Sequence, residues 1–191
     1  MEDNMPPKVK VTKEKIAESA FELVRKNGVE ALNARSIAQM LECSTQPIFS
    51  NYESMAELRK DVIKKAYELI LTYREREISS REFPSYKASG IAYIRFAKEE
   101  KNLFKLLFMS GSADMDDCDI AKNDWNSVVG SISGYAGVPE NKAELFHLEM
   151  WMFVHGVASM LATGNIGLEM NVVSNMLTDV YLGLKERYGE V

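Results

Sequence analysis

The chain has 191 residues, a net charge of −5 and two cysteines, and its length permits one large domain or a small module joined to a larger one. Met1 to Lys15 is polar and charged, unlike a secretory signal, and the most apolar stretch, Met150 to Ala162, is shorter than the roughly 20 residues that span a bilayer. Cys43 and Cys118 lie far apart with no C-x-x-C spacing, which indicates free thiols in a reducing compartment and implies no disulfide or zinc framework. We expect a cytoplasmic protein with no membrane segment.

Charge is distributed unevenly along the chain. Between Lys8 and Lys65 there are 11 basic and 8 acidic residues, whereas from Ala66 to Val191 there are 12 basic and 18 acidic residues. A mildly basic N-terminal part joined to an acidic remainder suits a module that faces phosphate, carried by a part that does not.

The first three predicted helices are short and closely spaced. Apolar residues at helical spacing predict a helix from Thr12 to the stop at Gly28, and a second helix from about Ala34 to Leu41. A tight connection over residues 42–44 leads to a third helix, from Thr45 to about residue 52. Two short helices joined this tightly predict a helix-turn-helix.

A long fourth helix, capped by Ser54 and running to about Ile78, links this head to the rest of the chain. Further helices are predicted over residues 85–100, 102–109, 117–135, 139–163 and 169–187, and no segment alternates like a strand for long. We therefore expect an all-α fold. An N-terminal arm and a three-helix helix-turn-helix DNA-binding domain occupy residues 1–53, and a helical-bundle ligand-binding and dimerisation domain occupies residues 54–191.

Several motifs with fixed spacing resemble one protein family. Between Ile16 and Leu58 the chain carries I-A-x-x-A-x-x-L-V-x-x-x-G-V-E-A-L-N-A-R-S-I-A and S-T-Q-P-I-F-x-N-Y-x-S-M-x-E-L, which resemble the DNA-binding domain of the tetracycline-repressor (TetR-like) family. Y-I-R-F-A-K-E-E-K-N-L-F-K-L-L-F and W-M-F-V-H-G, later in the chain, resemble the regulatory domain of a TetR-like subgroup with a Trp-x-x-x-His-Gly motif. The resemblance implies a homodimeric transcriptional regulator that binds double-stranded operator DNA and senses a ligand.

Three residues depart from the family pattern. Where the family usually has Gly in the turn, Tyr in the recognition helix and Lys just after it, this chain has Glu42, Phe49 and Met55. The family's Tyr hydroxyl and Lys ammonium are typical phosphate contacts, so their replacement removes two hydrogen bonds to DNA. These departures favour an alternative function, a ligand-binding or protein-interaction module of the same fold with little DNA affinity.

The predicted DNA contacts follow from helix-turn-helix geometry, in which the second helix enters the major groove. Gln and Asn can pair with adenine, Pro can pack against a thymine methyl group, and basic side chains can contact phosphate. The predicted residues are Lys10, Lys13, Arg35, Ser44, Thr45, Gln46, Pro47, Phe49, Ser50 and Asn51, with Lys8 as a further residue of the arm. As an alternative, Thr45 caps a helix and the others are solvated surface residues.

Aromatic residues and 11 methionines offer lining for an apolar cavity in the later helices. The predicted ligand-binding residues are Tyr93, Phe96, Phe108, Trp125, Trp151 and His155. We expect a small hydrophobic ligand held by a few polar contacts. Two alternatives stay open: His155 is a hydrogen-bonded core residue, or the core is filled and has no cavity.

The sequence contains no pattern of catalytic residues or metal ligands. His147 and His155 are separated by eight helical residues, roughly 12 Å at 1.5 Å per residue, too far for both to bind one metal. The acidic run from Asp114 to Asp119 fits no register of a calcium-binding loop. We expect no enzyme activity, no cofactor and no metal.

The last two predicted helices are candidates for the dimer interface. Residues 139–163 are apolar nearly all round, and a second apolar stripe consists of Val172, Val173, Met176, Leu177, Val180, Tyr181 and Leu184. Helices this apolar need covering on more than one face, which predicts a two-fold interface of four helices.

The predicted function is a repressor that a small hydrophobic ligand releases from DNA.

Overall fold

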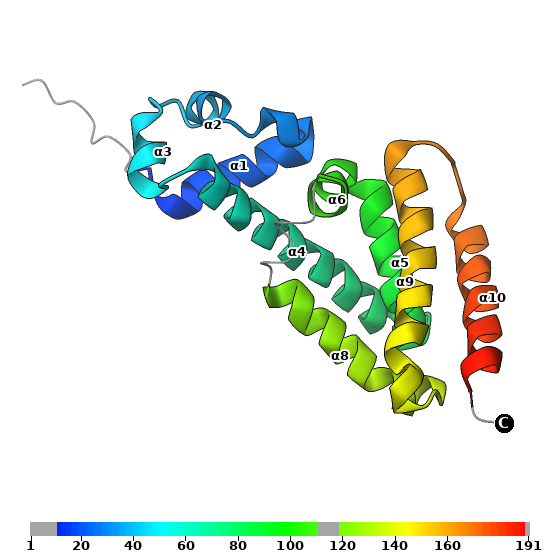
Figure 1. The fold of residues 1–191 in the computed structure, drawn as a ribbon. Helices are drawn as coiled ribbons and strands as arrows, with labels where there is room; N and C mark the ends of the chain where they lie inside the picture. Colours follow the sequence, from blue (N-terminus) through cyan, green and yellow to red (C-terminus); the bar gives the residue numbers. More distant parts are fainter. Residues whose placement is uncertain (1–10, 111–118, 190–191) are drawn as a thin grey trace, which may run out of the picture. The chain divides into compact units, whose positions relative to one another are not determined.

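The computed structural model describes residues 11–110 and 119–189, in which all regular elements are helices. In chain order (Figure 1) they are α1 (Lys13–Asn27), the short 3-10 helix η1 (Val29–Ala31), α2 (Ala34–Met40), α3 (Gln46–Asn51), α4 (Met55–Ser80), α5 (Ser85–Glu99), α6 (Lys101–Phe108), α8 (Asp119–Ala136), α9 (Glu140–Thr163) and α10 (Met170–Tyr188). The predicted all-α fold is confirmed. Predicted helix ends differ from the observed ends by a residue or two; the predicted start of α8 lies outside the described residues.

The chain divides into two compact units, residues 1–62 and 63–191, and the division falls inside α4. The sequence-based boundary after residue 53 lies just before this helix. Leu58 and Val62, on the first turns of α4, are fully buried in the first unit. The later turns of α4 belong to the second unit, so one continuous helix is shared by both.

The first unit is built on α1, α2, α3 and the start of α4. Helix α1 begins at Thr12, whose side chain accepts a hydrogen bond from the Lys15 backbone N–H, and ends at Gly28, which has a φ of 87°. This is the predicted stop, because a positive φ is favourable only for a residue without Cβ. Apolar side chains from the four helices form the core: Ile16, Ala20, Val24, Ile37, Ile48, Tyr52 and Leu58.

The second unit is built around α9, which packs against α5, α6, α8 and α10 (Figure 1). Among the described residues, α9 is the one helix that is long and apolar enough to cross a membrane. The same composition suits a core helix, and α9 contacts four other helices. Its buried residues are Ala143, Phe146, Met150, Val154, Val157, Ala158, Leu161 and Ala162.

The later turns of α4 are fixed to α5 by three contacts. The Tyr73 ring meets the buried Phe96 ring edge-on at a centroid distance of 5.5 Å, and the Tyr73 hydroxyl donates to Glu99 Oε2 at 2.9 Å. Farther along, Glu77 is buried and its Oε1 lies 2.7 Å from Nε of Arg95. These apolar and polar contacts hold the later turns of α4 against α5 within the second unit.

Candidate functional site

Helices α2 and α3 form the predicted helix-turn-helix, and the turn between them is a Schellman motif. The Cys43 N–H donates to Ala38 O at 2.9 Å and the Glu42 N–H donates to Gln39 O at 3.2 Å. This motif requires a left-handed residue after the helix, and Glu42 occupies that position with a φ of 51°. Glycine suits this position because a left-handed backbone conformation is strained for a residue with a Cβ atom. In this chain Glu42 adopts that strained conformation.

Helix α3 carries most of the predicted DNA contacts, and its polar side chains are partly engaged with their own helix. Ser50 Oγ donates to Gln46 O at 2.9 Å and Asn51 Nδ2 donates to Pro47 O at 2.7 Å. Phe49 is 55% exposed, and Gln46 is also exposed. The exposed surface of α3 therefore presents one large apolar ring together with short polar groups.

Of the predicted contacts outside α3, Ser44 and Arg35 are exposed, Thr45 is half-buried, and Lys13 is engaged in other contacts. The Lys13 ammonium lies 2.6 Å from Glu57 Oε1 and 4.5 Å from the centroid of the Tyr52 ring. Since this ion pair would have to open before Lys13 could contact phosphate, Lys13 is less available than the sequence suggests. Lys8 and Lys10 lie outside the described residues.

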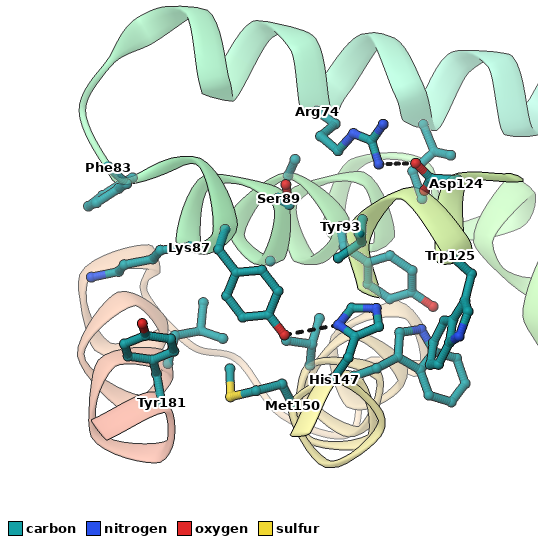
Figure 2. A pocket seen from close by; sticks show the side chains of 18 of the residues that line it. Arg74, Phe83, Lys87, Ser89, Tyr93, Asp124, Trp125, His147, Met150 and Tyr181 are labelled. Atoms are coloured by element: carbon teal, nitrogen blue, oxygen red, sulfur yellow. Dashed lines mark hydrogen bonds and ion pairs between the residues drawn. The ribbon is translucent and has the colours of Figure 1, made fainter. Parts of the chain in front are cut away.

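A cavity of about 850 Å³ lies within the second unit, in the size range of small-molecule sites. Helices α4, α5, α6, α8, α9 and α10 all contribute to its wall, which is mostly aromatic and aliphatic. Figure 2 shows the side chains around it. The cavity excludes the alternative of a filled core.

The cavity wall includes a hydrogen-bonded pair, Tyr86 and His147, with the Tyr86 hydroxyl 2.9 Å from His147 Nδ1 (Figure 2). Burial lowers the pKa of His147 to about 4, against a smaller opposing effect of Asp124, and burial raises the pKa of Tyr86. Both groups are therefore neutral near pH 7. With the imidazole proton on Nε2 the Tyr86 hydroxyl donates to Nδ1, and with the proton on Nδ1 the hydroxyl oxygen accepts, so the histidine tautomer sets the direction of this hydrogen bond.

Nε2 of His147 makes no hydrogen bond with any residue that the structure describes, and the imidazole centroid lies 4.4 Å from that of Trp125. The His147 side chain therefore offers one polar ring nitrogen to a ligand in an otherwise aromatic part of the wall.

Three charged side chains also line the cavity. Arg74 of α4 forms an ion pair with Asp124 of α8 (Figure 2). The Tyr67 hydroxyl also donates to Asp124, at 3.4 Å. Lys87 of α5 donates to Thr178 Oγ1 of α10 at 2.8 Å. The wall is consequently less purely apolar than the sequence suggests.

Four of the six predicted ligand-binding residues line the cavity: Tyr93, Phe108, Trp125 and Trp151. Phe96 does not, because its side chain is fully buried against Tyr73. His155 also lies outside the lining: Nδ1 is 2.9 Å from the Tyr93 hydroxyl, Nε2 is 3.3 Å from Ser159 Oγ, and its ring stacks on Trp151. In the W-M-F-V-H-G motif, Trp151 lines the cavity. His155 lies outside the lining, where it contacts the Tyr93 hydroxyl and stacks on the Trp151 ring.

Sequence reasoning missed several polar lining residues, notably Arg74, Tyr86, Lys87, Asp124 and His147. They are spread over four helices, α4, α5, α8 and α9, and a polar residue on an amphipathic helix is usually part of a solvated face. One signal is present in the sequence: His147 lies eight residues before His155 on the same apolar helix. Among the described residues, no group of three His, Cys, Asp or Glu side chains could hold a metal ion.

The architecture defines a class of protein, a helix-turn-helix unit followed by a helical unit that encloses a cavity. Residues 86–179 match the family model of the tetracyclin repressor-like C-terminal domain. No curated protein matches the chain in sequence.

Three solved structures share the fold over nearly the whole chain. A protein of unknown function from Rhodococcus sp. RHA1 is 16% identical, with a TM-score of 0.72 over 98% of this chain and 100% of its own. A TetR-like transcriptional regulator from Rhodococcus sp. RHA1 is 13% identical, with a TM-score of 0.67 over 91% and 96%. A ketosteroid transcriptional regulator of Mycobacterium tuberculosis is 10% identical, with a TM-score of 0.56 over 94% and 95%. The chain thus has the fold of TetR-like transcriptional regulators.

Proposed function

We propose that the protein is a cytoplasmic, TetR-like transcriptional repressor that binds operator DNA through α2 and α3 and is released when a small, largely hydrophobic ligand fills the cavity of the second unit. The observation that carries the proposal is this cavity, in a helical unit continuous through α4 with a helix-turn-helix. The regulator role is also supported by the matched C-terminal domain model and the shared fold.

The repressor is expected to act as a homodimer, because apolar groups remain exposed on α9 and α10. Met152 and Met160 of α9 are 60% and 52% exposed, and Gly156 lies between them on the same face. A Cβ built on Gly156 would meet no described atom within 4 Å beyond the backbone of its own helix, so no described residue packs closely enough to require a glycine there. A second copy packed closely against this face would cover both methionines and use the space at Gly156.

The proposed control mechanism is a change in the separation of the dimer's two DNA-binding units when a ligand fills the cavity. Two recognition helices of a dimer reach successive major grooves only when they lie roughly 34 to 36 Å apart. Because Ile70 and Arg74 of α4 line the cavity, a ligand contacts the helix that continues into the DNA-binding unit. By linkage, a ligand that weakens DNA binding must bind the DNA-bound dimer more weakly by the same factor.

The test is selection of DNA fragments by the purified protein, followed by anisotropy titration of selected and scrambled duplexes over a range of salt concentrations. The proposal expects tighter binding to the selected duplex, with a salt dependence that reports phosphate contacts. Lys122→Ala, on an exposed position of α8 in the second unit, is the control and should leave binding unchanged. Equal affinity for both duplexes would contradict operator binding, and weak affinity for both would favour the ligand-binding or protein-interaction module with little DNA affinity.

A further inference from the structure

The charges of the two basic side chains in the cavity wall are balanced differently. The Arg74 guanidinium is paired with the Asp124 carboxylate. Lys87 makes no ion pair with any carboxylate that the structure describes; its ammonium contacts the Thr178 hydroxyl at 2.8 Å and lies 4.7 Å from the centroid of the Phe83 ring. One positive charge at the cavity wall therefore has no counter-ion within the described parts of the chain.

The surroundings of Lys87 leave its charge only partly compensated. The side chain is half-buried, and an ammonium group has three donor hydrogens. The Thr178 hydroxyl accepts one hydrogen bond, and the face of Phe83 supplies a weak cation–π contact, but neither group carries a negative charge. A partly desolvated charge of this kind is stabilised by an anion that brings its own acceptor oxygens.

The position of Lys87 fits the polar end of an amphipathic molecule. In Figure 2, Lys87 lies at one end of the cavity with Phe83 and Tyr181, whereas Trp125 lies at the opposite end. Both tryptophans of the chain, Trp125 and Trp151, line the cavity and meet edge-on at a centroid distance of 6.1 Å. Aromatic rings therefore line both ends of the wall, and the Lys87 ammonium lies at the end away from Trp125.

Resting on the ligand-sensing function proposed above, we propose that the cavity is a site for an amphipathic organic anion. The apolar, aromatic body of the ligand lies against Trp125 and Trp151, and its carboxylate or sulfonate pairs with the Lys87 ammonium. Thr178 holds the ammonium in place through its hydroxyl oxygen. Arg74 is not the anion site, because a ligand there would first have to displace the Asp124 carboxylate.

The test compares two fluorescent probes with the same aromatic body, the anion 8-anilinonaphthalene-1-sulfonate and the uncharged N-phenyl-1-naphthylamine. Energy transfer from the two tryptophans reports occupancy of the cavity in the full-length protein, and competition between the probes shows that they share a site. Replacing Lys87 by Met removes the charge while keeping the length of the side chain. We expect Lys87→Met to weaken binding of the sulfonate about tenfold, the value of one partly screened charge-assisted hydrogen bond, and to change binding of the neutral probe less than twofold.

Three further variants complete the design. Lys87→Arg keeps the charge and should retain sulfonate binding, which separates loss of charge from loss of fold. Lys142→Met, at an exposed position of α9 outside the cavity lining, should change neither probe. Arg74→Gln should retain binding of the sulfonate, because the sulfonate pairs with the Lys87 ammonium.

Each contrary result has a distinct meaning. Equal weakening of both probes by Lys87→Met would show that Lys87 acts through packing, and would overturn the anion site while leaving the ligand cavity in place. Loss of sulfonate binding in Arg74→Gln but not in Lys87→Met would move the anion to Arg74 and also overturn the proposal. If neither probe binds with energy transfer from the tryptophans, the cavity is not a ligand site, and the proposed ligand control fails with it.

Discussion

The two units differ in how their functional groups are distributed along the sequence. In the first unit the helix-turn-helix is one continuous segment, and its turn, caps and helix lengths are decided by neighbouring residues. In the second unit the cavity wall takes residues from six helices, between Tyr67 and Leu182. Local chemistry thus specifies the first site, whereas packing of distant helices specifies the second.

The largest expected effect concerns the exposed apolar face of the second unit. Met152→Glu together with Met160→Glu should convert the dimer to a monomer, because each carboxylate would be buried in an apolar interface at a cost of several kcal/mol. We expect the dimer dissociation constant to increase by roughly 1,000-fold or more, because each 1.4 kcal/mol corresponds to a factor of ten. Sedimentation velocity measures the change in mass.

The matched control is Met109→Glu, a residue 47% exposed just after α6, and this variant should remain dimeric. Both methionines of α9 are more than half exposed in the single chain, so the double variant should keep its helix content. A folded double variant with unchanged dimer mass would show that the interface lies on another face.

The next effect concerns DNA affinity in the first unit. Phe49→Tyr with Met55→Lys restores the two groups that the family uses on phosphate, and should tighten binding to the selected duplex by about tenfold. The added Lys should also steepen the salt dependence by about one counterion per subunit. Arg35→Ala, at an exposed position near the start of α2, should weaken binding.

These three changes are measured by anisotropy on one selected duplex over a series of salt concentrations. Lys60→Ala, an exposed residue on α4, gives the general effect of losing one positive charge in the same unit. If binding ignores all three changes, α3 does not dock in the major groove as proposed.

The features that could be predicted from the sequence differ between the two units in the same way. Helix ends were predictable because Thr12, Gly28 and Ser54 act on the backbone within three or four residues of themselves. Aromatic lining such as Trp125 and Trp151 was predictable because large rings on successive helices must meet somewhere in the core. The Tyr86–His147 hydrogen bond and the Arg74–Asp124 ion pair were not, because their partners are separated by 61 and 50 residues and nothing local records the encounter.

A smaller effect tests the strained turn. Glu42 is held at a φ of 51° by the Schellman motif, and a residue with Cβ pays roughly 1 kcal/mol or more in this region. Glu42→Gly should therefore stabilise the first unit by about 1 kcal/mol, less a few tenths for the greater flexibility of the unfolded chain. Urea unfolding followed by circular dichroism measures the change.

Gly137→Ala is the opposite change at another left-handed position, with a φ of 67°, and should destabilise the protein by a similar amount. Removing the exposed Glu42 carboxylate should also tighten DNA binding if the turn faces phosphate. An unchanged unfolding midpoint in Glu42→Gly would mean that the turn relaxes without strain.

The smallest effect concerns the pH dependence of the second unit and depends on His147. Burial lowers its pKa to about 4, whereas the unfolded chain has an ordinary histidine pKa near 6.5. Between these two pH values the unfolded chain binds a proton that the folded protein does not, so stability is full above about pH 6.5 and falls as the pH is lowered toward 4. His147→Gln keeps a polar partner for Tyr86 and removes the titration. The urea midpoint of the wild type should therefore drop more between pH 7 and pH 5 than that of the variant.

His155→Gln is the matched comparison, because burial lowers the pKa of His155 too. This variant should lose part of the pH dependence of stability, and the double variant should lose most of it. The same drop in all four proteins would show that His147 does not titrate from a buried, neutral state in the cavity wall.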